Sequence, residues 1–171
     1  DVTAGRIVEG GSTITQELTR NLYLGSAQRT FSRKVKEACP ALKLAQTWPK
    51  KRILTAYLNE VFYGRAPHGA QAGAETFFSR RARDLTLAQA ALLAGLPQAP
   101  TVYDPFLHPA IATRRRNDVL RAMLANRVIT SQEFSQALAS PLGLKPGMLY
   151  TAQQQPNFSG WVEQQLVARF G

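Results

Sequence analysis

The chain has 171 residues, and its hydrophobic fraction of 44% provides enough apolar material for a core and excludes a disordered tail. Its formal net charge of +10 indicates a partner that carries negative charge, such as a phosphate-bearing ligand, a nucleic acid or a membrane surface. No run approaches the roughly 18 uncharged apolar residues of a membrane-spanning helix, so we expect any membrane anchor to lie outside this segment.

The first predicted helix, residues 12–24, begins in the stretch GGSTITQE, which is rich in hydrogen-bonding groups. Thr13 followed by Gln16 is the pattern of a capping box, and an ordinary helix start would account for most of these groups. Alternatively, the backbone amides and hydroxyls of this turn bind an anion or a sugar. Helical spacing predicts one buried face, formed by Ile14, Leu18 and Leu22.

The second predicted helix, residues 31–47, lies in the most basic part of the chain. Glu37 is the only acidic residue in the stretch 29–51, and it lies one helical turn after Arg33 and Lys34. Surface ion pairs would explain this spacing. The alternative is a carboxylate that orients a ligand within a cluster of cations, which would keep the carboxylate ionised.

The apolar side of the same segment predicts how this helix packs. Pro40 is expected to kink the helix beside Glu37, because proline lacks a backbone donor and its ring clashes with the preceding turn. The predicted buried stripe consists of Val35, Ala38, Cys39, Leu42 and Ala45.

The middle of the chain predicts five further helices and no strand-like alternation, so the expected fold class is all-α. Thr86 followed by Gln89 forms a capping-box pattern, and the sequence TSQE at 130–133 repeats it. Pro97 and Pro100 are expected to stop the helix that Thr86 opens. The predicted helices span residues 50–63, 70–79, 86–96, 109–127 and 130–139. In the first of these, the positions predicted to face inward are Ile53, Leu54, Tyr57, Leu58 and Val61.

Four segments, in order along the chain, match a set of sequence motifs. GGSTITQE is close to GxSTxTQQ, RKVKE at 33–37 matches RKxxE, KKRILTAYLN matches K-x-x-I-L-x-x-Y-L-N, and RRNDVL at 115–120 matches RRxxVL. With these motifs the chain resembles the peptidoglycan glycosyltransferases of glycosyltransferase family 51. These are the transglycosylase domains of class A penicillin-binding proteins and their monofunctional relatives. The resemblance implies an all-α, lysozyme-like fold with a cleft between a large lobe and a small jaw that touches the membrane.

The resemblance also implies the reaction, which is polymerisation of lipid II into glycan strands. The 4-hydroxyl of incoming lipid II attacks the anomeric carbon of the growing glycan, and undecaprenyl diphosphate leaves. The implied partners are lipid II, the lipid-linked glycan, the membrane surface and moenomycin-type inhibitors. A divalent cation, Mg²⁺ or Mn²⁺, often assists, and no organic cofactor is expected. The implied location is the extracytoplasmic face of a bacterial cell membrane.

The resemblance assigns roles to particular residues. Glu37 corresponds to the second glutamate of the family and is the expected catalytic residue. Asn59 and Arg115 are expected to support the architecture near the site. The expected substrate-binding residues are Ser12, Thr13, Gln16, Glu17, Arg20, Arg29, Arg33 and Lys34.

This chain departs from the family pattern in several places. The family's principal base lies in an earlier E-D-x-x-F-x-x-H motif, which this sequence lacks. We therefore expect a domain truncated at its N-terminus and inactive alone. Glu17 stands where the family has a second glutamine, and Ala45 stands where relatives often have a glutamate. The expected domain covers residues 1–147, and 148–171 are expected to form a linker and a helix leading toward a transpeptidase domain.

Two other function classes remain open at this point. One is a lysozyme-like hydrolase or lytic transglycosylase, and the other is a non-enzymatic basic module that binds anionic lipid or nucleic acid. The sequence has no helix-turn-helix, zinc spacing or aromatic stacking strip, so specific nucleic-acid binding is not expected. His68 and His108 lie in predicted loops without neighbouring ligands, which argues against a histidine metal site.

Overall fold

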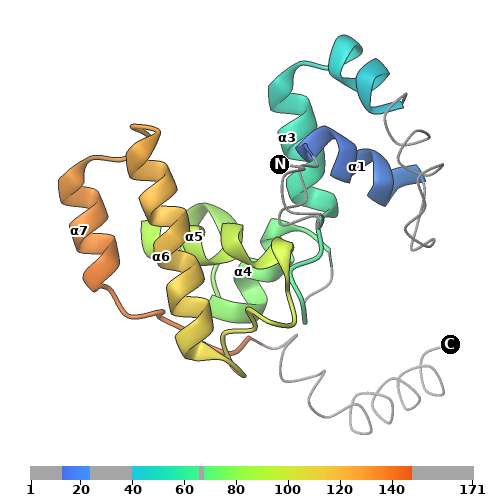
Figure 1. Cartoon of the computed structure of the whole chain (residues 1–171). Helices are drawn as coiled ribbons and strands as arrows, with labels where there is room; N and C mark the ends of the chain where they lie inside the picture. Colours follow the sequence, from blue (N-terminus) through green and yellow to red (C-terminus); the bar gives the residue numbers. More distant parts are fainter. Residues whose placement is uncertain (1–12, 24–39, 66–67, 148–171) are drawn as a thin grey trace, which may run out of the picture. The chain divides into compact units, whose positions relative to one another are not determined.

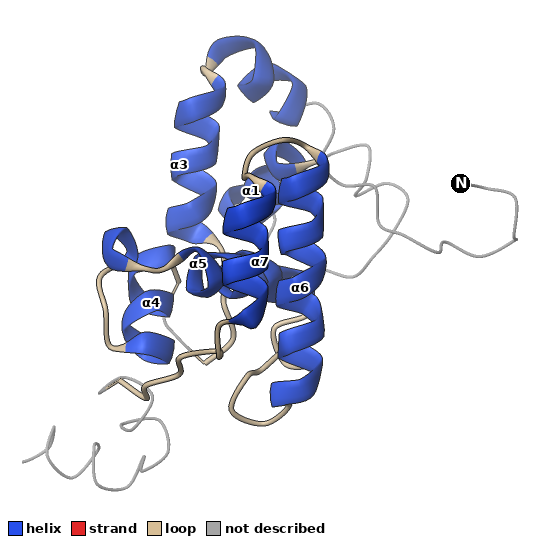
Figure 2. Ribbon diagram, turned by 90° about the vertical axis from the view of Figure 1, so that its left-hand side faces the viewer, coloured by secondary structure: helices blue, strands red, loops and turns tan. Residues whose placement is uncertain are grey.

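A computed structural model describes residues 13–23, 40–65 and 68–147. The chain divides into two compact units, residues 1–61 and 62–171, and each unit is described by itself. Every regular element in the described residues is helical, which confirms the expected all-α fold class (Figures 1 and 2). Within those residues no helix combines the length and apolarity needed to cross a bilayer.

The first unit is built around two packed helices. Helix α1 (Ile14–Tyr23) contacts α3 (Lys50–Glu60), and residues 40–47 form another helix before α3. Each of these three segments contributes one side chain to a shared core cluster, formed by Leu18, Leu44 and Ile53. The cluster fixes which face of α1 is buried, because Leu18 is fully buried in it.

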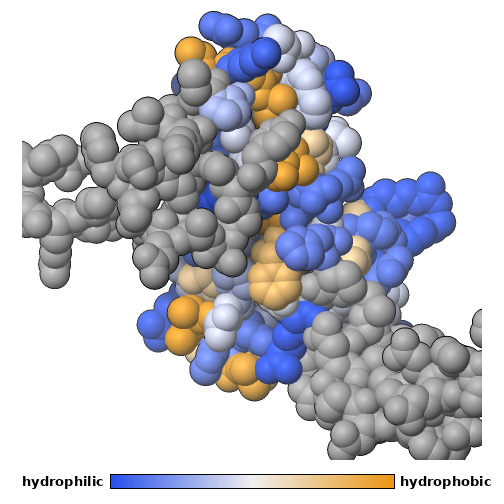
Figure 3. All heavy atoms as spheres, turned by 90° about the vertical axis from the view of Figure 1, so that its right-hand side faces the viewer, coloured by the Kyte–Doolittle hydropathy of each residue, from blue (hydrophilic) through white to orange (hydrophobic). Residues whose placement is uncertain are grey.

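Only part of each predicted apolar stripe in the first unit is buried. Leu18 and Ile53 are buried as predicted, but Leu54 is 45% exposed. The stripe predicted from helical spacing is wider than the fully buried contact, since each helix contributes one buried residue to the core cluster and Ala56 and Tyr57 of α3 are only partly buried against it. The predicted inward residues that are exposed instead are Ile14, Leu22, Leu54 and Leu58. Figure 3 shows one face of the molecule, on which hydrophobic side chains interrupt a largely hydrophilic surface.

The buried side of residues 40–47 also differs from the prediction. Ala41 and Leu44 are buried, whereas Leu42 is 61% exposed and Ala45 is exposed. The predicted stripe is therefore out of register by one position. Leu44 decides the register, because it is the residue that reaches Leu18 and Ile53 in the core cluster. The predicted kink at Pro40 involves the preceding turn, which lies outside the described residues.

Helix α3 ends three residues before the predicted end. Val61 has extended backbone, with φ −70° and ψ 140°, and its N–H bonds the Tyr57 carbonyl as a helix cap. Val61 and Tyr63 are buried while Phe62 between them is 44% exposed. Burial at every second residue is typical of extended chain. The helix therefore ends at Glu60, before Gly64.

In the second unit, α5 (Leu87–Gly95) is the central helix. It contacts α4 (Ala70–Phe78), α6 (Pro109–Ala125) and α7 (Ser131–Ala139), as Figures 1 and 2 show. Its sequence, LAQAALLAG, is apolar nearly all round, which is typical of a helix buried on several sides. The core cluster between α5, α6 and α7 consists of Ala88, Ala91, Leu120 and Ala137.

Both predicted capping boxes of the second unit are confirmed. Thr86 accepts from the Gln89 backbone N–H, and the Gln89 side chain accepts from the Thr86 N–H. Thr130 and Glu133 make the same pair of bonds at the start of α7. The donations from the Thr130 backbone N–H and then from its hydroxyl lower the pKa of Glu133.

Prolines shape the connection after α5. The α-helix stops before Pro97, as predicted, but the chain continues through a 3-10 turn, η2 (Leu96–Gln98). Pro97 lies in the first turn of η2, where a missing N–H costs nothing because that donor would be unpaired. A second 3-10 turn, η1 (Ala82–Asp84), connects α4 to α5.

Residues 141–147, which we call the C-terminal strap, have irregular backbone and bind the carboxyl end of α4. The Lys145 N–H donates to the Phe77 carbonyl at 2.9 Å, and the Gly147 N–H donates to the Thr76 carbonyl at 3.0 Å. A side chain at Gly147 would overlap the carbonyl oxygen of Glu75, so only glycine allows this close approach. The strap is therefore held by main-chain bonds at a fixed place.

Candidate active site

The start of α1 holds the predicted polar turn, and its side chains form a helix cap. The Thr13 N–H donates to Gln16 Oε1 at 3.0 Å, and the Gln16 N–H donates to Thr13 Oγ1 at 3.2 Å. These bonds satisfy two of the donors that a helix start leaves unpaired, and they confirm the capping box. The cap uses the oxygen of the Gln16 amide, so the side-chain NH₂ group takes no part in it.

Glu17 connects α1 to α3. The Tyr57 hydroxyl donates to Glu17 Oε2 at 3.0 Å, and both side chains are partly buried. Tyr57 also packs against the core cluster of the first unit. The carboxylate that replaces the expected glutamine is thus fixed in place by a residue of the third predicted motif.

Arg20 lies on α1 three positions after Glu17 and is partly buried. It is therefore on the same side of the helix as the capped turn. The remaining predicted catalytic and substrate-binding residues lie outside the described residues: Ser12, Arg29, Arg33, Lys34 and Glu37. Their convergence with Arg20 around one ligand stays a prediction.

The two residues expected to support the site differ in their surroundings. Asn59 is exposed near the end of α3, and its expected role stays a prediction. Arg115, on α6, donates from Nε to the Gly95 carbonyl at 3.1 Å, and its guanidinium lies 5.5 Å from the centroid of the Tyr103 ring. A Cβ at Gly95 would meet the Arg115 side chain at 2.9 Å. Arg115 thus holds the carboxyl end of α5 close to α6, through a hydrogen bond and through packing on Gly95.

Arg116 is a structural residue that the sequence analysis missed. It is only 3% exposed, and its guanidinium donates to the Ser140 carbonyl at 2.6 Å and to the Leu138 carbonyl at 3.2 Å. It therefore caps the carboxyl end of α7 from α6. Burial lowers the pKa of Arg116. Its spacing of four from the buried residues Ala112 and Leu120 is the signal that could have revealed it.

A buried carboxylate organises the loop between η2 and α6. Asp104 is 5% exposed and accepts from the Arg65 guanidinium, in an ion pair that bridges two loops. Its other oxygen accepts from the backbone N–H groups of Phe106 and Leu107, at 3.0 and 3.4 Å. Nearby in sequence, burial raises the pKa of Tyr63 to about 12. The Asp104 contacts thus join the loop after η2 to Arg65.

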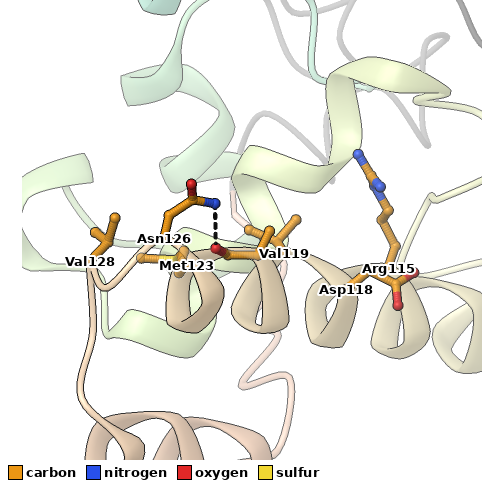
Figure 4. Close-up of a pocket in the computed structure, with 7 residues that line it drawn as sticks. Arg115, Asp118, Val119, Met123, Asn126 and Val128 are labelled. Atoms are coloured by element: carbon orange, nitrogen blue, oxygen red, sulfur yellow. Dashed lines mark hydrogen bonds between the residues drawn. The ribbon is translucent and has the colours of Figure 1, made fainter.

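Two grooves lie on the second unit. One, of about 350 Å³, is lined by α6 residues from Arg115 to Met123 and by Asn126 and Val128 after the helix (Figure 4). Arg115 extends away from α6 at one end, and the Asn126 amide donates back to the Ala122 carbonyl at 2.8 Å. The other, of about 430 Å³, lies between α5, α7 and the C-terminal strap. Arg115 is the one predicted site residue that lines either groove.

A metal site is not formed by the described residues. In residues 13–23, 40–65 and 68–147, no group of three or more His, Cys, Asp or Glu side chains is placed to hold a metal ion.

Comparison with known proteins gives a consistent result. A sequence profile of the family described as Transglycosylase matches residues 1–124. The chain is 47% identical over 142 residues to Penicillin-binding protein 1A of Aquifex aeolicus (strain VF5), covering 83% of this chain and 19% of that protein. It is 37% identical over 171 residues to Penicillin-binding protein 1A of Neisseria meningitidis (strain DSM 15465 / Z2491), covering 100% of this chain and 21% of that protein.

A solved structure is similar as well. The crystal structure of Penicillin-Binding Protein 1A from Haemophilus influenzae aligns with a TM-score of 0.54 and 25% sequence identity. The alignment covers 94% of this chain and 20% of that protein. The chain thus spans about a fifth of the length of these relatives.

Proposed function

This chain belongs to the transglycosylase family, and we propose that it is the glycosyltransferase part of a penicillin-binding protein that polymerises lipid II. The observation that carries this proposal is the family match over residues 1–124, which contains all four motifs in order. The reaction forms a bond between the 4-oxygen of lipid II and the anomeric carbon of the growing glycan. The bond from that carbon to undecaprenyl diphosphate breaks, and the diphosphate leaves with the electron pair. The proton of the 4-hydroxyl passes to the general base that the reaction requires.

Basic side chains stabilise the diphosphate in this proposal. Arginine pairs with phosphate oxygens through two parallel hydrogen bonds, and lysine adds a point charge. Negative charge grows on the diphosphate as it leaves, so fixed cations favour the transition state over the bound substrate. The cations assigned to this role are Arg20, Arg29, Arg33 and Lys34.

Glu37 has a different role in the same site. The surrounding cations would keep its carboxylate ionised, so it accepts hydrogen bonds from sugar hydroxyls and orients the reacting groups. The turn at Ser12, Thr13 and Gln16 lines the cleft beside it. A divalent cation, Mg²⁺ or Mn²⁺, would add further positive charge beside the leaving diphosphate.

The location in the cell follows from the substrate. Lipid II and its polymer are held in the membrane by undecaprenyl chains, so the site works at the extracytoplasmic surface of a bacterial cell membrane. The formal net charge of +10 suits the anionic substrate and the anionic membrane.

The test is incorporation of labelled lipid II by the protein that carries this sequence. Glu37→Gln removes the charge but keeps the size of the side chain, and we expect it to reduce polymerisation at least about 100-fold. Glu75→Gln is the matched control, because Glu75 is an exposed glutamate of the second unit. Full polymerisation by the Glu37 variant would remove this residue from the mechanism.

Analysis of the products separates the proposed reaction from its rivals. Polymerisation releases undecaprenyl diphosphate and should be blocked by moenomycin. Release of muropeptides from finished glycan without undecaprenyl diphosphate would instead identify a lytic enzyme. Binding of duplex DNA with a steep salt dependence, without preference for lipid II over plain anionic lipid, would indicate a non-enzymatic module.

A further inference from the structure

The start of α3 carries positive charge without a balancing acid. Residues 40–59 contain four basic residues and no acidic residue. Three of the four, Lys50, Lys51 and Arg52, are consecutive and exposed in the first turn of α3. Within the part of the chain that the structure describes, none of these three side chains forms an ion pair. Their charges therefore attract an anionic partner from outside the chain.

A tryptophan lies at the same place, just before α3. Trp48 is partly buried and packs against the core cluster of the first unit. The Arg52 guanidinium lies 4.0 Å from the centroid of the Trp48 ring, so a cation and an aromatic ring are held together. Tryptophan combines an apolar body with one polar N–H group, and it is enriched where proteins meet the surface of a membrane.

Apolar side chains follow the cations along α3. Leu54 lies one helical turn after Lys51, and Leu58 lies one turn further, so the three share one side of the helix. Leu54 is 45% exposed and Leu58 is 38% exposed. Aliphatic side chains gain nothing from the phosphate backbone of duplex DNA, whereas they gain from burial among lipid headgroups and acyl chains. The combination of cations, tryptophan and leucines therefore favours a membrane surface over a nucleic acid.

We propose that this surface, which we call the lipid-facing corner, binds an anionic phospholipid membrane. Its cations pair with headgroup phosphates, and its leucines and indole ring enter the boundary between headgroups and acyl chains. The partner is bulk phospholipid and not lipid II, so the inference and the proposed function can fail independently. The lipid-facing corner consists of Trp48, Lys50, Lys51, Arg52, Leu54 and Leu58.

The experiment measures sedimentation of the 171-residue chain with lipid vesicles, after circular dichroism has shown that each variant is as helical as the unmodified chain. One set of vesicles contains one part phosphatidylglycerol to two parts phosphatidylcholine, and the other contains phosphatidylcholine alone. We expect binding to the anionic vesicles at least about 30-fold tighter than to the neutral ones. The difference should shrink when salt is raised from about 0.05 to about 0.5 M.

The first variant combines Lys50→Gln, Lys51→Gln and Arg52→Gln. Each cation near an anionic surface contributes about five-fold to affinity, so we expect binding to the anionic vesicles to weaken about 30- to 100-fold. The control removes the same charge from exposed arginines at separate places in the second unit, and it should weaken binding less than about five-fold, because scattered cations do not all face one membrane. An equal loss in both would overturn the inference. The control changes are Arg80→Gln, Arg114→Gln and Arg127→Gln.

The second variant tests the apolar part of the lipid-facing corner. Leu54→Ser combined with Leu58→Ser keeps every charge, and we expect it to weaken vesicle binding about five-fold or more, at low and at high salt, because the lost term is burial of apolar surface. It should leave any binding of duplex DNA unchanged. Unchanged vesicle binding in this variant would indicate a purely electrostatic surface and would overturn the inference.

A third measurement locates the contact directly. The chain has two tryptophans, so Trp161→Phe leaves Trp48 as the sole tryptophan. Bromine atoms on the acyl chains quench tryptophan fluorescence at short range, and we expect anionic vesicles that carry them to quench Trp48. Vesicles that bind the chain without quenching Trp48 would show that another surface meets the membrane, and the inference would be wrong.

Discussion

Burying an arginine lowers the stability of a fold unless its guanidinium N–H groups find acceptors. Arg116 shows how this chain meets that requirement. Its guanidinium bonds two carbonyls at the end of α7 and the side chain of Asn117. A helix end leaves its last carbonyls without partners inside the helix. Arg116 supplies these partners from α6, and it joins the two helices without a matching acidic residue.

Removing this guanidinium should destabilise the second unit. We expect Arg116→Ala to lower the free energy of unfolding by about 2 to 4 kcal/mol, because it leaves buried carbonyls unpaired and opens a cavity. Arg114→Ala is the control, since Arg114 is exposed on the same helix and should change stability by less than about 0.5 kcal/mol. Urea unfolding followed by circular dichroism measures both. Equal stability of the two variants would contradict the capping role.

Tyr63 predicts a dependence of stability on alkaline pH. Burial raises its pKa to about 12, whereas an unfolded tyrosine titrates near 10, so between these values the unfolded state loses its proton first. The contribution of Tyr63 to the free energy of unfolding is therefore fully present below about pH 10, and it is lost as the pH rises toward 12. By pH 11.5 the loss should reach about 2 kcal/mol.

The measurement for Tyr63 is the difference between two proteins. Unfolding free energies of the unmodified chain and of Tyr63→Phe are compared at about pH 8 and about pH 11.5. Phenylalanine cannot titrate, so the stability of the variant should fall less over this interval. The same fall in both proteins would assign the alkaline loss to other groups.

Single residues differ in how far their roles can be read from sequence. The Thr13 and Gln16 pair was predictable, because a capping box depends on neighbours three positions apart. Arg116 was not recognised, because a run of arginines resembles an exposed basic helix face. The contact of Glu17 with Tyr57 spans forty positions along the chain, and no local pattern encodes it.

At the scale of elements, the C-terminal strap is the least regular segment and is closely held. Its amides at Lys145 and Gly147 donate to carbonyls at the end of α4, and the Gln89 side chain donates to the Gly143 carbonyl at 3.3 Å. The strap's partners in these bonds thus belong to two different helices, α4 and α5. The strap therefore ties the end of α4 to the start of α5 without forming a strand or helix.

Gly147 is the position where the strap should be most sensitive to substitution. Gly147→Ala places a methyl group against the Glu75 carbonyl, so we expect the strap to detach from α4. Hydrogen exchange at Lys145 and Gly147 should speed up at least about ten-fold, since their amides lose acceptors. Lys145→Ala removes only an exposed side chain and should leave exchange unchanged. Slow exchange in the Gly147 variant would contradict this account.

Helix starts were easier to predict than buried faces. The capping boxes at Thr86 and Thr130 mark two starts because the chemistry of a cap is local. The buried face depends on which neighbour a helix meets. For that reason the apolar residues Leu42, Leu54 and Leu58 are exposed, although helical spacing predicts that they face inward. The end of α3 was also missed, since the extended chain after it is apolar too.

At the scale of the whole molecule, positive charge is shared between the two units. Residues 1–61 contain ten basic and five acidic residues, and residues 62–171 contain eleven and six, so each unit carries a formal charge of +5. Attraction to anionic surfaces is therefore a property of both units. Charge alone does not locate a substrate site, so the predicted site depends on the sequence motifs.

The sequence predicts that the 171 residues alone do not polymerise lipid II. They lack the E-D-x-x-F-x-x-H motif, and an attacking hydroxyl needs a positioned base. The check is incorporation of labelled lipid II by this chain, with the protein that carries this sequence as the reference. Circular dichroism must first show that the chain is helical. Polymer formed by the chain itself would show that a base lies within it.

The strap also has a mechanical consequence. Its bonds to Thr76 and Phe77 are the last described attachments before residues 148–171, so a pull on that end of the chain would load the end of α4 first. Such a force would have to tear main-chain bonds one after another before it reached the centre of the unit. A force on the carboxyl end would therefore break the bonds between the strap and α4 before it deformed α5.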